Sequence, residues 1–314
     1  MNLSHPWWEP IRSDLNELLR LCEPQSRLDW LNEKAKERAC LNGRGQGIEF
    51  VDQAKWPGRH YEDWINQHAQ VPTRLSGKGQ WHDLFNALVW LRWPLSKAQL
   101  NRMHALSSPA GAGSRGLMRD RATLIDEQSL IWVDCDSRLT QALCRRDWKA
   151  LFITQRNRWQ ASGQSQGLFI FGHALFEKCM APYKALTAHV LLISAPDVPD
   201  LRPDPQDQVI EAPFEVLASS LSGDSVGQWL DASLANKLRV WTDAMADIRD
   251  RQEPADCAEN SAIAPGDARA TAVADQAQAF KRQGKLFPLP VLGVPGWHED
   301  NLWEGFYDDS QVFR

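Results

Sequence analysis

The sequence predicts an α+β fold that is predominantly α-helical. Apolar side chains recur three and four residues apart through most of residues 1–195, which is the spacing of amphipathic helices. Two segments are apolar nearly all round, as buried helices are. The last thirty residues contain many Pro and Gly, which forbid long helices and predict an extended segment. A hydrophobic content of 43% and fifteen Trp predict a large aromatic core or groove.

Amphipathic helices are expected at the beginning of the chain. The first covers residues 11–22 and ends before Pro24. A second begins at Ser26 and closes at Asn42-Gly43, and a third covers residues 61–68. Each places its apolar side chains on one face, so each is expected to cover a core with that face.

The segment 81–93, WHDLFNALVWLRW, predicts the first buried helix because it has almost no polar face. Pro94 is expected to end it. The pattern Ser96-x-x-Gln99 then resembles a capping box, which predicts a following helix at about 97–106.

Strands and a second buried helix are expected in the next hundred residues. ATLI and LIWVD flank the polar residues DEQS, which predicts a short β-hairpin over 122–134. Residues 138–160 are expected to be helical, and GLFIFGHALFEKCM at 167–180 predicts the second buried helix. The run 183–193, YKALTAHVLLI, fits a buried strand or a short helix equally well.

Composition divides the chain into four parts. Residues 1–195 are expected to form the main domain, and residues 196–251 an acidic, partly helical region. Ten Ala and few large apolar residues predict a linker or insertion over 252–283. Residues 284–314 are expected to pack back on the main domain.

The sequence indicates a cytoplasmic protein. The N-terminus lacks a basic region followed by an apolar region, and no apolar run reaches the length of a spanning helix. The six Cys form no C-x-x-C pair, so reduced thiols are expected. The net charge is −5, with the negative charge concentrated after residue 196, which makes nucleic acid an unexpected partner. A small molecule or peptide is the expected partner.

The candidate site consists of polar side chains on the two buried helices. His82 and Asn86 are four residues apart and share a face, with Asp83 beside them. His173 and Glu177 repeat the same spacing on the second helix. Unpaired polar groups cost about 1–3 kcal/mol when they are buried. These side chains are therefore expected to meet one another, an ion, water or a ligand.

A divalent metal ion fits this set of side chains. His and carboxylate side chains are ligands of Zn, Mn and Fe, and H-x-x-x-E presents two of them from adjacent helical turns. The predicted ligands are His82, His173, Glu177 and His189. The predicted catalytic residues around them are Asp83, Asn86, Asp120 and Lys184.

Two functions therefore stay open. The first is a metal-assisted hydrolase, with a phosphoester as one substrate class, in which a carboxylate orients water at the metal. The second is a non-enzymatic binding module with a Trp-rich groove, in which the same polar side chains form satisfied hydrogen bonds of the core. The two differ in whether the protein binds a metal.

Several ordered blocks carry a family resemblance. They are WHDLFNALVWLRWP, RDRATLIDE, DWKALF, FGHALFEK, PYKALTAH, PLPVLGVPGW and FYDDSQVFR. Together these blocks resemble the bacterial family known as domain of unknown function 3025, over nearly the whole chain. The family has no established activity or cofactor, so the resemblance implies no mechanism. It implies that the Ala-rich segment 252–283 is a local insertion.

Overall fold

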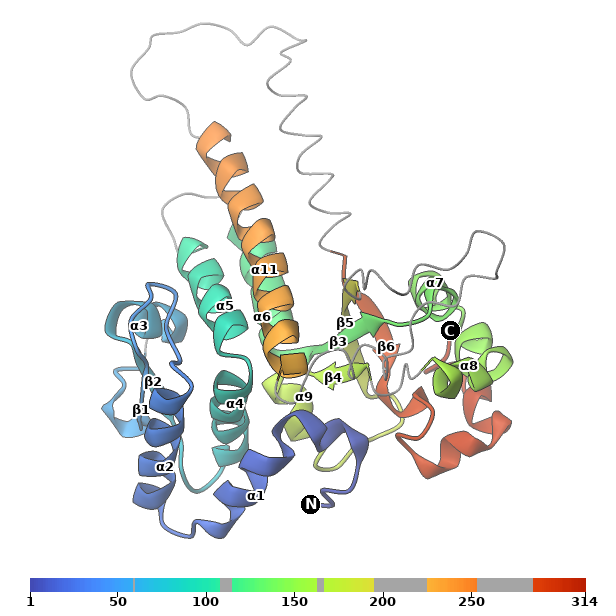
Figure 1. Ribbon diagram of the computed structural model, residues 1–314, viewed down its shortest axis with the longest axis horizontal. Coiled ribbons are helices and arrows are strands. Elements are labelled where there is room, and N and C mark those ends of the chain that lie inside the picture. The colour runs from blue at the N-terminus through green and yellow to red at the C-terminus, as the bar shows by residue number, and fades with distance from the viewer. Residues whose placement is uncertain (59, 108–114, 163–166, 195–224, 253–284) are drawn as a thin grey trace, which may run out of the picture.

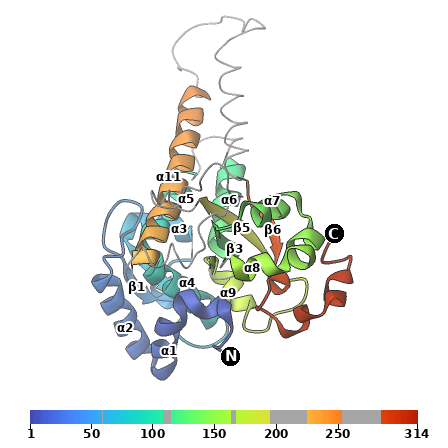
Figure 2. The same cartoon turned by 45° about the vertical axis from the view of Figure 1, so that its right-hand side comes forward.

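The computed structural model describes residues 1–58, 60–107, 115–162, 167–194, 225–252 and 285–314, and it confirms the α+β, predominantly helical fold (Figure 1). The α-helices are α1 (Arg12–Arg20), α2 (Pro24–Glu37), α3 (Tyr61–His68), α4 (Gln80–Arg92), α5 (Pro94–Leu106), α6 (Arg115–Gln128), α7 (Ser137–Arg145), α8 (Arg156–Ala161), α9 (His173–Lys178) and α11 (Ser225–Gln252). Helices α1–α5 gather on one side of the molecule, and α7, α8 and the C-terminal segment lie on the other (Figures 1 and 2). None of the described helices has the length and apolar character needed to cross a membrane.

Two small sheets accompany the helices. Their strands are β1 (Glu49–Asp52), β2 (Gln70–Thr73), β3 (Ser129–Asp134), β4 (Leu168–Ile170), β5 (Thr187–Ser194) and β6 (Phe287–Pro290). Strands β1 and β2 pair in parallel, and the larger sheet has the order β4-β3-β5-β6. In the larger sheet β3 and β5 run parallel, and each edge strand is antiparallel to its neighbour.

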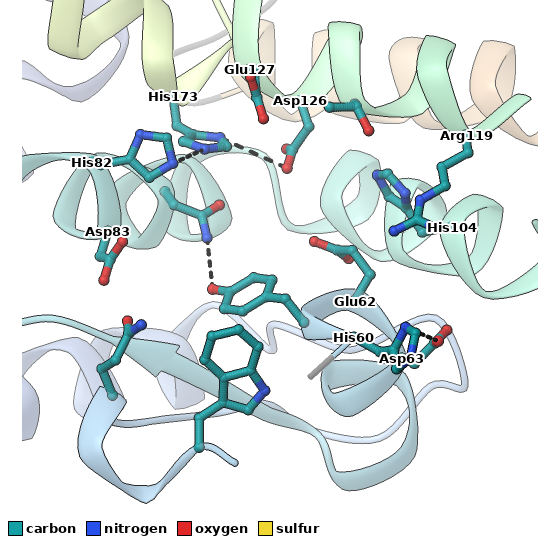
Figure 3. Close-up of a pocket in the computed structure, with 15 residues that line it drawn as sticks. His60, Glu62, Asp63, His82, Asp83, His104, Arg119, Asp126, Glu127 and His173 are labelled. Atoms are coloured by element: carbon teal, nitrogen blue, oxygen red, sulfur yellow. Dashed lines mark hydrogen bonds and ion pairs between the residues drawn. The ribbon is translucent and has the colours of Figure 1, made fainter. Parts of the chain in front are cut away.

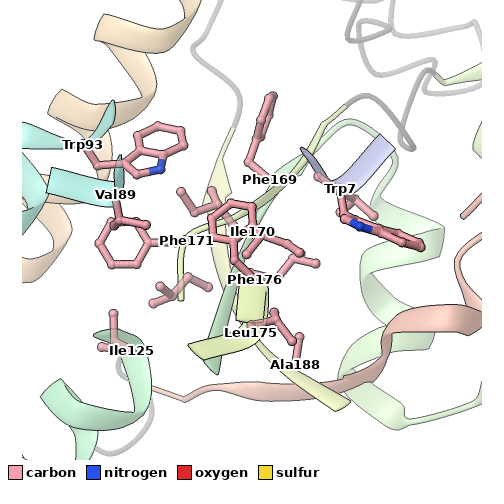
Figure 4. Packing of buried hydrophobic residues seen from close by; sticks show 14 of the residues in the cluster. Trp7, Val89, Trp93, Ile125, Phe169, Ile170, Phe171, Leu175, Phe176 and Ala188 are labelled. Carbon is pink, nitrogen blue, oxygen red and sulfur yellow. The ribbon is translucent and has the colours of Figure 1, made fainter. Parts of the chain in front are cut away.

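The tryptophans are mainly core residues. Nine of the fifteen are buried: Trp7, Trp8, Trp90, Trp93, Trp132, Trp148, Trp159, Trp241 and Trp297. Figure 4 shows Trp7 and Trp93 in the same apolar cluster as Phe171 and Phe176. Burial of such large rings is a main source of the free energy of folding.

One aromatic group joins the two helices that carry the predicted site. Trp8, in the 3-10 helix Pro6–Ile11, stacks on Phe85 of α4 with ring centroids 5.7 Å apart and on Phe176 of α9 at 5.8 Å. Phe85 and Phe176 also stack on each other at 5.9 Å. His82 and His173 each precede one of these phenylalanines by three residues, which puts each His on the same helical face as its Phe. The aromatic packing therefore places the two histidines opposite each other.

The predicted hairpin over 122–134 is wrong in its first half. Only LIWVD forms a strand, as part of β3, whereas ATLI and DEQ belong to α6. Met118, Ala122 and Ile125 are buried four and three residues apart, which is a helical period. The hairpin pattern begins at residue 122 and therefore does not include Met118, the buried residue that reveals the helical period.

The second predicted buried helix, residues 167–180, is a strand followed by a short helix. Leu168–Ile170 form β4, and α9 begins at His173 after Gly172. The Gly172 N–H donates to the Ser129 carbonyl at 2.9 Å, which holds this bend against the start of β3. The ambiguous run that follows forms strand β5, paired on both sides.

Helix α5 begins earlier than predicted and is capped from a distant part of the chain. Pro94 occupies the first helical position, and Ser96 lies inside the helix instead of capping it. The buried Asp231 carboxylate of α11 accepts hydrogen bonds from the N–H groups of Leu95 and Ser96, both at 2.9 Å, and from the Ser96 hydroxyl at 2.6 Å. Asp231 thus satisfies the free N–H groups at the helix start, which a local Ser was predicted to do.

The C-terminal segment lies on the main body. Strand β6 pairs with β5, and the Trp148 indole N–H donates to the Arg314 carbonyl at 2.8 Å. Along the chain between β5 and β6, the structure describes α11. The predicted linker 252–283 lies outside the described residues except for residue 252, which ends α11.

Gly172→Ala is expected to lower the free energy of unfolding by about 1–3 kcal/mol, because the added Cβ would overlap the backbone of Glu127 and Gln128. Urea denaturation of purified protein measures this change. Gly47→Ala is the matched control, since a Cβ at Gly47 would meet no atom within 4 Å. Equal stability of the two variants would contradict the close approach of α9 to the end of α6.

Candidate functional site

A polar cavity of about 340 Å³ opens between α3, α4, α5, α6 and α9. Figure 3 shows its lining, in which ionisable side chains point toward one another from opposite walls. The lining residues are Gln53, Trp56, His60, Tyr61, Glu62, Asp63, His82, Asp83, Asn86, His104, Arg119, Thr123, Asp126, Glu127 and His173. The cavity therefore includes four of the eight predicted site residues: His82, Asp83, Asn86 and His173.

The two predicted histidines meet in the wall of this cavity. The Nε2 atoms of His82 and His173 lie 3.1 Å apart, with the ring planes nearly perpendicular. On its other side, His82 presents Nδ1 to the Glu177 carboxylate at 3.0 Å. Glu177 therefore contacts the ring of His82 and stands behind it, away from the point between the two Nε2 atoms.

His173 also has a carboxylate behind it. Its Nδ1 lies 3.8 Å from Oδ2 of Asp126 and makes no hydrogen bond, although the side chain is buried. Burial lowers the pKa of His173 to about 3, against the opposing effect of the Asp126 charge. The ring is thus neutral and keeps a lone pair for a cation.

Lys97 forms a buried ion pair with Asp126. The distance from Nζ to Oδ1 is 2.5 Å, and the two side chains are 3% and 9% exposed. Burial alone would raise the pKa of Asp126, but the charge and hydrogen bond of Lys97 outweigh it and hold the pKa below its ordinary value. Asp126 is therefore a carboxylate that points at His173.

Asn86 and Tyr61 extend this polar chain toward α3. Asn86 accepts a hydrogen bond from Lys97 Nζ at 2.9 Å and donates one to the Tyr61 hydroxyl at 3.1 Å. Tyr61 donates in turn to the Pro72 carbonyl at 3.2 Å. Because its hydrogen bonds are taken up in this way, Asn86 orients Lys97 and is not positioned as an acid or a base.

Carboxylates outnumber cations around the cavity. Its lining contains the acids Glu62, Asp63, Asp83, Asp126 and Glu127, against Arg119 as the permanently charged base. Asp83 accepts a hydrogen bond from the Arg74 N–H at 2.8 Å, and burial raises its pKa. A lining of this charge favours a cation.

The other predicted site residues lie elsewhere. His189 is near the start of β5, opposite Ser129 of β3 and Pro288 of β6, and it does not line the cavity. The structure therefore does not bring His189 into the cavity lining with the other two histidines, because strand pairing holds it in the sheet. Lys184 pairs with Asp309 at 3.3 Å and lies over the Phe306 ring. Asp120 is exposed on α6, outside the lining.

The described residues contain no group of three or more His, Cys, Asp or Glu side chains placed to hold a metal ion. Of the four predicted ligands, His82 and His173 bring their Nε2 atoms within 3.1 Å of each other. Glu177 contacts Nδ1 of His82 instead, and His189 does not line the cavity.

The comparisons with known proteins give one finding. The family model described as protein of unknown function (DUF3025) matches residues 48–239 and 229–314. The chain belongs to the DUF3025 family. No curated protein and no solved structure matches the DUF3025 chain significantly.

The sequence patterns missed several cavity residues of the DUF3025 chain. His104 lines the cavity from α5, a helix whose spacing predicts an ordinary amphipathic element, and Lys97 of the same helix pairs with the lining residue Asp126. A buried charge such as Lys97 needs a partner. Asp126 is 29 residues away along the chain, so no local sequence pattern predicts the pair. The predicted hairpin places Asp126 in a turn, whereas its position on α6 brings its carboxylate to Lys97 and His173.

Lys97→Met is expected to lower the free energy of unfolding by about 3–5 kcal/mol, because the buried Asp126 carboxylate loses its counter-charge. Urea denaturation measures the loss. The double variant Lys97→Met/Asp126→Leu removes both charges and is expected to recover most of the stability. Arg239→Met, which breaks the exposed pair with Asp243, is the matched control and should leave stability nearly unchanged. A small effect of Lys97→Met would contradict a buried ion pair.

Proposed function

We propose that this chain is a metal-assisted hydrolase in which Nε2 of His82 and Nε2 of His173 would hold a divalent ion. The observation that carries the proposal is the pair of opposed Nε2 atoms, 3.1 Å apart, with a carboxylate behind each ring. A carboxylate on the far nitrogen is the usual support of a metal-binding histidine, because it fixes the tautomer and the ring orientation.

The tautomers of the two rings support this proposal. Glu177 holds the His82 proton on Nδ1, so Nε2 of His82 is an acceptor. Without a metal, His173 must then donate from its own Nε2, which leaves its Nδ1 lone pair facing the Asp126 carboxylate. That is the buried Nδ1 that lacks a hydrogen bond. If both Nε2 atoms held a metal ion, His173 would carry its proton on Nδ1, the nitrogen that faces the Asp126 carboxylate.

The cavity supplies the further groups that hydrolysis needs. Asp83 follows His82 on α4, and with Glu127 and Glu62 it lines the same cavity, where a carboxylate would orient a water molecule. A divalent ion lowers the pKa of bound water and polarises the bond to be cleaved. Water and substrate would complete the coordination of a two-histidine site, since catalytic metal sites keep open positions.

We propose a phosphoester as the substrate class. Arg119 lines the cavity, and the guanidinium group binds phosphate in a bidentate manner. The surrounding carboxylates would repel a phosphate unless a metal ion offset their charge, so metal and substrate are expected to bind together.

A cytoplasmic location is part of this proposal. The five described cysteines, Cys22, Cys40, Cys135, Cys144 and Cys179, are all free thiols. Burial raises the pKa of Cys40 and of Cys179 to about 12, so these two thiols are protonated and unreactive.

Wild-type protein is expected to bind one equivalent of Zn²⁺, Mn²⁺ or Fe²⁺ in calorimetric titration and to hydrolyse bis-p-nitrophenyl phosphate with that metal. His82→Ala and His173→Ala remove a ligand each and should abolish both properties. Glu177→Gln keeps both ligands and should weaken metal binding about 10–100-fold. His189→Ala is the matched control, a histidine outside the cavity, and should bind and hydrolyse like wild type.

Three results would count against the proposal: absence of metal binding by wild type, metal binding that survives both His→Ala changes, or equal loss in His189→Ala. If wild type binds no metal and His173→Ala lowers only the free energy of unfolding, by about 1–3 kcal/mol, the polar cluster is structural. That pair of results would favour the binding-module alternative.

A further inference from the structure

A second surface, remote from the cavity, lies on the C-terminal segment. Leu302 and Trp303 are 76% and 72% exposed, more than any other large apolar side chain that the structure describes. Leu302 ends the 3-10 helix Glu299–Leu302, and Trp303 separates it from the 3-10 helix Glu304–Asp308. This C-terminal segment, red in Figures 1 and 2, is on the side of the molecule away from α3, α4 and α5. Exposed apolar side chains that adjoin each other mark interaction sites more often than isolated ones do.

The Trp303 side chain is held in place. Its six-membered ring lies directly over the backbone of Gly305, where a Cβ atom would overlap Cζ2 and Cη2 of the indole. Hydrogen bonds on both sides fix its backbone: Trp303 N–H donates to the Asp300 carbonyl at 3.2 Å, and Phe306 N–H donates to the Trp303 carbonyl at 3.0 Å. A ring that is already oriented loses little conformational entropy on binding.

The ring stands at the edge of a depression of about 650 Å³. Pro182, Leu292 and Phe306 contribute apolar surface to its lining, and Lys184 and His298 contribute polar surface. Lys184 is already paired with Asp309 at 3.3 Å. The depression thus offers room for one apolar side chain beside Trp303.

Acidic side chains surround this surface. Glu299, Asp300, Glu304 and Asp308 are all exposed, within ten residues of one another. A surface of this charge repels an anionic membrane and repels a second copy of itself. It complements a segment that carries Lys or Arg.

We propose that Leu302 and Trp303 form a docking surface for a basic segment of a partner protein, in which an apolar side chain enters the depression and flanking Lys or Arg residues meet the acidic rim. Tryptophan is prominent among the residues that carry most of the binding energy in interfaces, and a charged rim adds specificity and a faster association rate. The surface shares no residue with the cavity, so the inference is independent of the proposed hydrolase activity.

Selection of a random peptide library displayed on phage, with the full chain immobilised, tests the proposal. The enriched peptides are expected to carry an apolar residue flanked by Lys or Arg. A synthetic winner, labelled for fluorescence anisotropy, should bind Trp303→Ala roughly 30-fold more weakly than wild type. Glu304→Lys should also weaken it, and added salt should weaken binding to wild type.

Two further variants separate a docking surface from a folding effect. Gly305→Ala keeps every side chain of the surface but displaces the Trp303 ring, so it should weaken binding while the melting temperature changes little. Leu19→Ala, at an exposed apolar residue of α1, is the matched control and should bind like wild type. The proposal is overturned if no peptide is enriched, if the winners lack basic residues, or if they bind Trp303→Ala as tightly as wild type. Binding to anionic vesicles or self-association through Trp303 would overturn it as well.

Discussion

The stacking of Phe85 on Phe176, with Trp8 against both, is the contact on which the candidate site depends. Neither ring takes part in any chemistry. Each lies one helical turn after a histidine, so the packing that excludes water from the rings also fixes the distance between His82 and His173. The separation of 3.1 Å between the Nε2 atoms is therefore a property of the apolar core as much as of the polar cluster. The bend at Gly172 also positions His173, because it brings the start of α9 close to the backbone at the end of α6.

Local patterns were sufficient to predict part of this arrangement. His82, His173 and Glu177 stand on segments with almost no exposed face, and the cost of burying them unpaired predicted that they meet. His82 contacts both His173 and Glu177. The predominantly helical α+β fold follows from spacing in the same way, because the period of the apolar residues is a local property of the sequence.

Contacts between distant segments decided the rest. The position of His189 depends on which strands pair with β5. The parallel pairing of β3 with β5 joins distant segments, so neither strand alone predicts it. Lys97 resembles a solvent-exposed residue of an amphipathic helix until its pairing with Asp126 is known. The hairpin pattern places Asp126 in a turn. Asp126 belongs to α6 instead, because the apolar residues of that helix begin before residue 122.

The cap that α11 places on α5 has a consequence for synthesis of the protein. Asp231 is made 135 residues after Ser96, which at common elongation rates is a delay on the order of ten seconds. During that interval the nascent α5, which carries Lys97 and His104, lacks the carboxylate that satisfies its first N–H groups. The ribosome therefore synthesises every residue that lines the cavity before it synthesises Asp231, the residue that caps one of the lining helices.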